Sequence, residues 1–341
     1  MRKTVFTSII LVLAVALFAG SYAGDFMVIG SGVRALGLSG SFAATADDAS
    51  AIYWNASGIA QIRQTEINLM RGYLYEGLAT YDNLSIVQPL PNDVSIGVNW
   101  TRLSIEDIPY FPESALVGTV DQRAVFPWLN LSAIPESEFN STDDLIQISF
   151  AKRIRYDVNL GWLFFRIPFD FHFGGNIKYI KRKIDSTLGT GTGFDFSTLF
   201  RTNLSDIFDY PWLGYLAYGM NFQDIGGTTV SWETSSQRED TVLMNTKLAA
   251  AYTQEILPLN STWMISGDMD LIYGRTLHYG TEFTYADRAA IRMGYQNNRN
   301  EGQSNNFSAG ASVKFYDFSV DYAFITSDLG NTNRIGLRVN F

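Results

Sequence analysis

Cysteine is absent from this chain of 341 residues, and histidine occurs only twice. The missing cysteines exclude disulfides, thiolate catalysis and cysteine-ligated zinc or iron–sulfur centres, and two histidines are too few for a three-histidine metal site. Charge is also scarce, because only 17% of the residues are charged, against about 25% in an ordinary soluble domain. The net charge of −9 argues against a nucleic-acid partner, since binding to phosphates needs a basic surface.

Long apolar runs are missing as well, except near the N-terminus. Arg2 and Lys3 precede an apolar stretch over 9–19, and the small residues Ser21 and Ala23 follow it. This order predicts a secretory signal peptide over residues 1–23, cleaved near Ala23. The stretch is too short for a transmembrane helix, which needs about 20 apolar residues. We therefore expect the protein to be exported.

Most of the remaining chain alternates between apolar and polar residues. At the C-terminus, Ile335, Leu337, Val339 and Phe341 alternate with Arg334, Gly336, Arg338 and Asn340. A period of two indicates a strand with one apolar and one polar face. The same pattern predicts fourteen strands, near 65–75, 79–89, 94–104, 144–154, 169–183, 193–203, 213–224, 241–255, 261–274, 276–285, 287–297, 305–316, 318–327 and 333–341. Between them, residues 105–143, with four prolines, and 181–193, rich in glycine and threonine, are predicted as loops.

These strands suit either a secreted sandwich or a barrel in the bacterial outer membrane. Their length approaches the ~9–11 residues that cross a tilted bilayer, their number is even, and aromatic residues collect at their ends. The sequence therefore predicts an all-β fold, a fourteen-stranded antiparallel transmembrane β-barrel over residues 65–341. Its lumen-facing polar residues are predicted to include His172, Lys178, Asp268, Asp270, Glu282 and Arg292. We expect the terminal Phe341 to form part of the signal by which the barrel-assembly machinery inserts the protein among outer-membrane lipids.

Residues 24–64 lack this alternation and are rich in small side chains, which predicts a short N-terminal hatch that plugs the lumen. The run from Arg34 through Gly40, followed by ADDAS at 46–50 and NASG at 55–58, resembles the hatch of FadL-like long-chain fatty-acid transporters. It is similar, too, to the PorV/PorQ-like branch of that superfamily, which includes type IX secretion components. The resemblance implies a fourteen-stranded barrel whose hatch is fixed by Arg34, Asp47, Asp48, Asn55 and Gly58. This chain departs from the family at Ala56, where a proline is usual. From the residues alone, Asp47 and Asp48 could instead cap a helix, and Gly58 could end one.

Two functions remain open. The first is uptake of hydrophobic or amphipathic small molecules, such as long-chain fatty acids, through a lumen gated by the hatch. The second is that of an accessory barrel in a type IX-like secretion system, which binds exported proteins or a translocon. An enzyme is not expected, because no catalytic constellation is found, and we expect no cofactor, no metal and no nucleic-acid partner. Gly174 and Gly175 are a candidate for a side opening in the wall.

Overall fold

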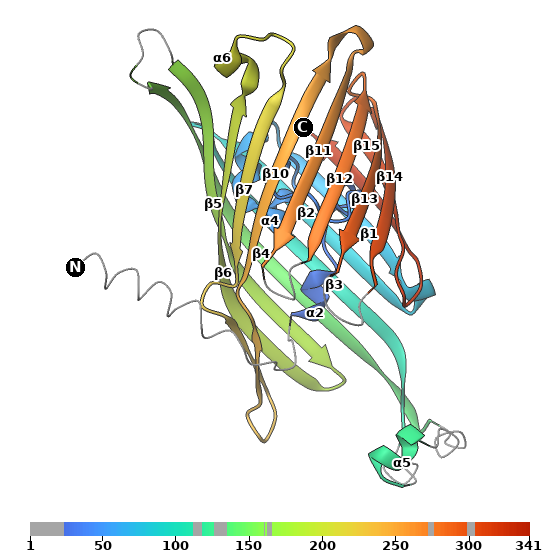
Figure 1. The fold of residues 1–341 in the computed structure, drawn as a ribbon. Helices are drawn as coiled ribbons and strands as arrows, with labels where there is room; N and C mark the ends of the chain where they lie inside the picture. Colours follow the sequence, from blue (N-terminus) through green and yellow to red (C-terminus); the bar gives the residue numbers. More distant parts are fainter. Residues whose placement is uncertain are drawn as a thin grey trace, which may run out of the picture.

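Among the residues that the computed structural model describes (24–111, 118–125, 135–159, 161, 166–271, 276–298 and 304–341), fourteen antiparallel strands close into one barrel (Figure 1). β1 pairs with β16 at one closure and β5 with β6 along the ring, so the predicted fold class is confirmed. The predicted signal peptide lies outside the described residues. The barrel strands are β1 Glu66–Leu74, β2 Ala79–Leu90, β3 Val94–Tyr110, β4 Ser137–Asn159, β5 Arg166–Ile184, β6 Thr187–Asn203, β7 Tyr215–Gln223, β10 Asn245–Ile256, β11 Ser261–Asp270, β12 Leu277–Tyr285, β13 Ala289–Asn297, β14 Asn306–Phe315, β15 Phe318–Ile325 and β16 Thr332–Asn340.

The outer face of this barrel is largely apolar, whereas the inner face is mostly polar but includes apolar residues such as Met70, Tyr81 and Leu145. On β13, Ile291 and Met293 are 65% and 68% exposed, whereas Arg292 between them is 4% exposed. Because side chains alternate along a strand, one register fixes both faces of the wall. An apolar outside and a polar inside are typical of a barrel in a lipid bilayer.

The two ends of the barrel differ. At the end where β1 begins and β16 stops, here called the turn end, β2–β3 and β12–β13 are joined by tight turns. Asn92, Asp93, Ala286 and Asp287 have positive φ there, as two-residue hairpin turns require. The opposite end, the loop end, carries the connection from β3 to β4 with α5 (Val120–Val125). Other described connections between barrel strands contain the short helices α6 Leu204–Phe208, η2 Tyr75–Gly77 and η5 Leu257–Leu259.

Three loop-end segments differ from the prediction. The loop expected over 181–193 is wrong: β5 runs to Ile184 and β6 starts at Thr187, where a Cβ on Gly189 would lie 2.8 Å from Trp232. A hairpin of β8 (Thr228–Trp232) and β9 (Glu239–Val242) was missed, and Trp232 at the end of β8 occupies the space that Gly189 leaves. The predicted loop over 105–143 is partly strand, because β3 and β4 continue to pair with each other past the ends of β2 and β5. There each strand has only one neighbour, and such an edge position tolerates Pro109.

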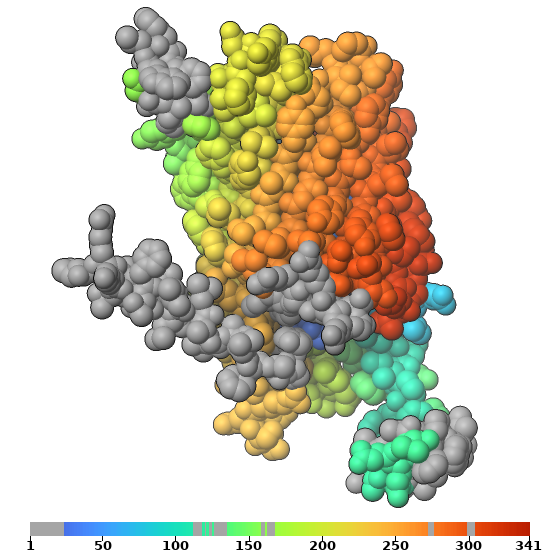
Figure 2. Space-filling view, in the orientation of Figure 1, coloured from blue at the N-terminus to red at the C-terminus, as the bar shows by residue number. Residues whose placement is uncertain are grey.

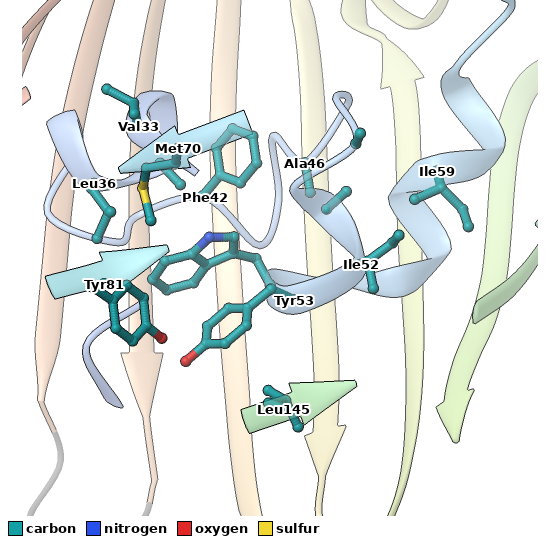
Figure 3. Close-up of a cluster of buried hydrophobic side chains, with 14 of the residues drawn as sticks. Val33, Leu36, Phe42, Ala46, Ile52, Tyr53, Ile59, Met70, Tyr81 and Leu145 are labelled. Atoms are coloured by element: carbon teal, nitrogen blue, oxygen red, sulfur yellow. The ribbon is translucent and has the colours of Figure 1, made fainter. Parts of the chain in front are cut away.

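Inside the barrel lies the segment 24–62, here called the plug. It contains α2 (Asp25–Val28), α3 (Val33–Gly37), α4 (Ala51–Trp54) and η1 (Ala56–Gln61). From the viewpoint of Figure 2, little of the blue plug is visible behind the wall. Phe42, Ile52 and other apolar side chains of the plug are buried together (Figure 3). None of the helices in the described part of the chain is long and apolar enough to cross a membrane.

Glycines on the inner wall let the plug backbone lie directly against the strands. A Cβ on Gly294 would lie 2.3 Å from the carbonyl carbon of Leu38, and one on Gly219 would lie 2.4 Å from the carbonyl oxygen of Ala43. Any larger residue at these positions would force the plug away from the wall. The small residues of both partners therefore set how tightly the lumen is filled.

Candidate functional site

Arg34 in α3 links the plug to the wall through charged hydrogen bonds. Its Nε and Nη2 atoms donate to the two carboxylate oxygens of Glu282 on β12, at 2.9 and 2.8 Å. Nη1 donates to Asp47 within the plug, and Arg292 on β13 donates to Glu282 as well. Burial alone would lower the pKa of the Arg34 guanidinium, but Asp47 and Glu282 raise it well above its usual range. Arg34 therefore stays charged, and the structure brings four of the predicted residues into one cluster.

Asp48 contacts the plug and the wall, but the alternative that it caps a helix is wrong, because Ser50 is the N-cap residue of α4 and no side chain caps this helix. Its Oδ1 atom accepts hydrogen bonds from the backbone N–H and the hydroxyl of Ser50, just before α4, at 2.9 and 2.5 Å. Its other oxygen, Oδ2, lies 3.7 Å from Nη1 of Arg34 and 3.6 Å from Nη1 of Arg338 on β16. Asp48 thus orders the turn that leads into α4 and faces two cations from the plug and the wall.

Asn55 and Gly58 lie where the plug meets β6 and folds back on itself. The amide of Asn55 donates to the carbonyl oxygens of Ala43, at 2.7 Å, and of Thr198, at 3.1 Å. Gly58 lies inside η1 rather than at a helix end, so its expected role as a cap was wrong. A Cβ on Gly58 would lie 2.1 Å from the carbonyl oxygen of Ala46, which explains why only glycine fits there.

Asp268 on β11 holds the plug backbone. Its Oδ2 atom accepts hydrogen bonds from the N–H groups of Phe42 and Ala43 at 3.1 and 2.9 Å. Further wall side chains donate hydrogen bonds to plug carbonyl oxygens: Asn176 to Ile52, Asn221 to Trp54 and Ser308 to Gly37. The polar inner face of the barrel therefore satisfies the backbone of a segment that has little secondary structure of its own.

A cavity of about 360 Å³ remains between the plug and the wall at the loop end. Its apolar lining residues include Leu36, Tyr53, Trp54, Leu74 and Val242. Figure 3 shows Leu36, Tyr53, Tyr81 and Leu145 at this end of the plug. Burial raises the pKa of the Tyr53 hydroxyl well above its ordinary value, so this group contributes a neutral hydroxyl. The volume falls within the ~300–1,000 Å³ typical of sites for small molecules.

The polar lining of the cavity includes neutral side chains and two groups of ion pairs. Asp270 lies 2.9 Å from Nζ of Lys247 and 2.9 Å from Nε2 of His278. Lys178 lies 2.8 Å from a carboxylate oxygen of Asp195 and 2.8 Å from one of Asp224. Each of these carboxylates therefore has a cationic partner, although Lys178 is shared by two of them.

Arg334 on β16 is different. Its side chain lines the cavity, its residue is 3% exposed, and its guanidinium lies 5.4 Å from the centre of the Tyr81 ring. Its Nε and Nη1 atoms have no hydrogen-bond partner within the part of the chain that the structure describes. A buried guanidinium without a carboxylate is costly, which makes this position a candidate anion site. The sequence showed Arg334 only as one polar residue of the last strand.

The remaining predicted residues lie apart from the cavity. His172 on β5 is buried on the same inner face as Gly174, which contacts η1 at Ser57, and neither of its ring nitrogens has a partner among the described residues. Phe341 is 70% exposed at the turn end, where its backbone N–H donates to the carbonyl of Thr65 at 2.9 Å. Within the described residues, no three His, Asp or Glu side chains are grouped so that they could hold a metal ion.

Comparison with known proteins finds similarity in fold. No protein-family model and no curated protein matches the chain. Among solved structures, the CymD monoaromatic hydrocarbon channel is similar over 92% of this chain and 98% of its own, with a TM-score of 0.54 and 11% identity. A deltaS2 mutant of the TodX monoaromatic hydrocarbon channel gives the same TM-score and identity, over 92% and 99%. A FadL homologue from Pseudomonas aeruginosa has a TM-score of 0.52 and 8% identity, over 91% and 98%. At such identities the likeness establishes the barrel fold.

Proposed function

We propose that the protein is a channel of the bacterial outer membrane that takes up hydrophobic or amphipathic small molecules through a lumen gated by the plug. The observation that carries this proposal is the cavity at the loop end, which combines apolar lining residues with the guanidinium of Arg334, whose Nε and Nη1 atoms have no partner among the described residues. The outward apolar faces of the strands support the membrane location. The similar solved structures named as hydrocarbon channels support the class of solute.

The orientation follows from the connections. Outer-membrane barrels have short periplasmic turns and longer external loops. The turn end then faces the periplasm and the loop end faces outward, so the cavity lies on the side from which a nutrient arrives. The plug, between the cavity and the turn end, blocks free diffusion.

We infer that the solute is an acid with an apolar chain, such as a long-chain fatty acid. A carboxylate can accept two parallel hydrogen bonds from a guanidinium, the geometry that arginine recognises best. Leu36, Trp54 and Val242 would contact the chain. A plain hydrocarbon would leave Arg334 unpaired, whereas an acid would neutralise it.

Passage beyond the cavity requires the plug to shift or the wall to open. Gly174 and Gly175 do not interrupt the wall, because both pair in register with β4 and β6. The ladder on the other side of β6 has a gap instead: Gly191 is the last residue paired with β8 and Phe196 the first paired with β7. Within it, the backbone N–H of Ile225 donates to the carbonyl of Phe194 at 2.9 Å. Asp195 lies in that gap, beside the cavity residues Lys178 and Asp224. This gap is the better candidate for a side route.

The alternative role in protein secretion draws on the arm formed by β3 and β4 at the loop end. Phe111 in this arm is exposed, and Trp128, in the same connection, lies outside the described residues. Co-purification with a large translocon, together with a secretion defect and normal uptake in a deletion strain, would favour this role and overturn the uptake proposal.

Equilibrium binding to the purified protein in detergent tests the proposed ligand. Hexadecanoic acid and hexadecanol, which share a chain and differ in the head group, are compared on the wild type and on Arg334→Gln. We expect the wild type to prefer the acid and the variant to lose that preference while it keeps the alcohol. Equal binding of both ligands by the wild type would show that the site does not recognise the carboxylate.

A further inference from the structure

A row of charged side chains crosses the outer face of the wall from β1 to β5, near the loop end. The strand register places Arg71 beside Asp82, Asp82 beside Arg102, Arg102 beside Asp144 and Asp144 beside Lys181. Arg71 donates to both carboxylate oxygens of Asp82, at 2.7 and 2.8 Å, and Arg102 to both of Asp144, at 2.7 and 2.9 Å. The first four members therefore neutralise one another in pairs.

The row ends in surplus positive charge on β5. Lys181 and Lys183 are both exposed, and they share the outer face because they are two residues apart. Neither has an ion-pair partner within the described ranges. On the opposite wall the outward positions at the loop end of β12 and β13 are Leu277 and Asn297, which carry no charge. At this level, the described outward positions of β12 and β13 therefore lack a counterpart of the two lysines.

An apolar groove lies on the same strands, nearer the turn end. Its volume is about 670 Å³. Its walls are the exposed side chains of Ile86, Ile96, Val98, Ile148, Phe150 and Ile177. Gly175 lies in register beside Phe150 and has no side chain, which leaves room for the groove beside this ring.

Aromatic residues separate the groove from the charges. Trp100 and Tyr179 occupy the register row between the groove and the row of Arg102 and Lys181. From Ile177 to Lys181 the distance along β5 is about 13 Å, at roughly 3.3 Å per residue. Charge, aromatic ring and aliphatic chain thus follow one another in the order of a bilayer's phosphate, interface and acyl levels.

We propose that this face binds one phosphate-bearing lipid, with its phosphate at Lys181 and Lys183 and an acyl chain in the groove beside Gly175. The proposal rests on the membrane location given above, but it concerns a site on the opposite side of the wall from the cavity. Charge complementarity selects an anionic head group, and the groove selects a lipid over free phosphate. The lipid would fix the height of the barrel in the leaflet at its loop end.

The test offers the full-length protein in detergent an equal mixture of phosphatidylglycerol and phosphatidylcholine with identical chains, and native mass spectrometry counts the lipid retained. We expect the wild type to retain phosphatidylglycerol in excess. Lys181→Gln with Lys183→Gln should reduce this preference roughly tenfold to thirtyfold, the equivalent of about 1 kcal/mol for each lysine. The matched control is Arg288→Gln with Lys314→Gln, which removes the same charge on another part of the wall and should keep the preference.

Equal retention of both lipids by the wild type would overturn the proposal, as would a preference that survives in the Lys181/Lys183 variant. A second comparison uses phosphatidylglycerol with six-carbon chains, which cannot fill the groove, and equal retention of this short lipid would also overturn it. Hexadecanoic acid binding is measured on the same samples. In the wild type, absence of a lipid preference together with intact acid binding refutes only the lipid site, whereas absence of acid binding together with an intact lipid preference refutes only the proposed uptake function.

Discussion

Replacing Arg334 by methionine should stabilise the empty protein and weaken its binding of an acid. Methionine keeps an unbranched chain beside Tyr81 but removes the buried guanidinium, whose Nε and Nη1 atoms have no hydrogen-bond partner among the described residues. A residue that serves only the fold would show the opposite sign for stability. The two effects together therefore separate a ligand site from a structural one.

The magnitudes follow from the surroundings of the guanidinium. Burying an unpaired ion costs several kcal/mol, while the contact with the Tyr81 ring returns about 0.5–2 kcal/mol. We therefore expect Arg334→Met to raise the free energy of unfolding of the empty protein by about 1–3 kcal/mol. Hydrogen bonds to a charged group contribute about 1.5–3 kcal/mol, so the affinity for an acid should fall by roughly 10- to 150-fold.

Both quantities can be measured in detergent micelles, by urea-induced unfolding and by equilibrium binding of hexadecanoic acid. Arg63→Met is the control, because Arg63 is half-exposed and paired with Asp93, at 2.8 Å, where an ion pair contributes at most about 1 kcal/mol. Arg334→Lys should keep part of the acid affinity. A large loss of stability in Arg334→Met with unchanged acid affinity would refute the reasoning.

Three further predictions concern the plug and the end of the chain. Asp268→Ala leaves the N–H groups of Phe42 and Ala43 without their acceptor, which costs about 1–3 kcal/mol of stability for each group. The variant should raise the ion conductance of single channels in planar bilayers. Unchanged conductance would show that Asp268 does not hold the plug. Val33→Cys with Gly336→Cys places two Cβ atoms about 3.3 Å apart in a protein without other cysteines, so oxidation should form a disulfide between plug and wall. The disulfide should abolish uptake, and its reduction should restore it. Uptake that continues after oxidation would show that the plug stays in place during transport. Deletion of Phe341 should reduce the heat-resistant, membrane-inserted fraction in cells, and full insertion would contradict its role as an assembly signal.

The strands could be predicted from the sequence because the alternation of apolar and polar residues depends only on neighbouring positions in the chain. Each barrel strand has its apolar and polar positions in the order that the wall requires, so periodicity alone located all fourteen. The β8–β9 hairpin escaped because its two strands are short and their contacts are tertiary. Trp232 packs on Gly189, and Val242 packs against Gly24 at the start of the plug.

The candidate site could be predicted only in parts. Arg34 and Glu282 were both singled out, yet they are 248 positions apart, and only the path of the plug brings them together. Arg334 was missed because what sets it apart is that its Nε and Nη1 atoms have no hydrogen-bond partner among the described residues. That is a property of the fold and not of the residue type. His172 and Asp268 looked alike in the sequence as inward polar residues. Asp268 contacts the plug backbone, whereas the ring nitrogens of His172 have no hydrogen-bond partner among the described residues.

The way the plug is attached favours movement over permanent closure. Asp268, Asn176 and Asn221 hold it by hydrogen bonds to its backbone, and Arg34 holds it by an ion pair with Glu282. Each such hydrogen bond contributes only about 0.5–1.5 kcal/mol net, because water can replace the partner, and a buried ion pair adds little beyond the cost of its desolvation. In a lumen that admits water these contacts can be exchanged one at a time. A plug attached to the whole inner wall by apolar surface would instead lose about 25 cal/mol for every Å² exposed, with no compensation from water. The polar inner wall therefore positions the plug firmly and still lets it be displaced.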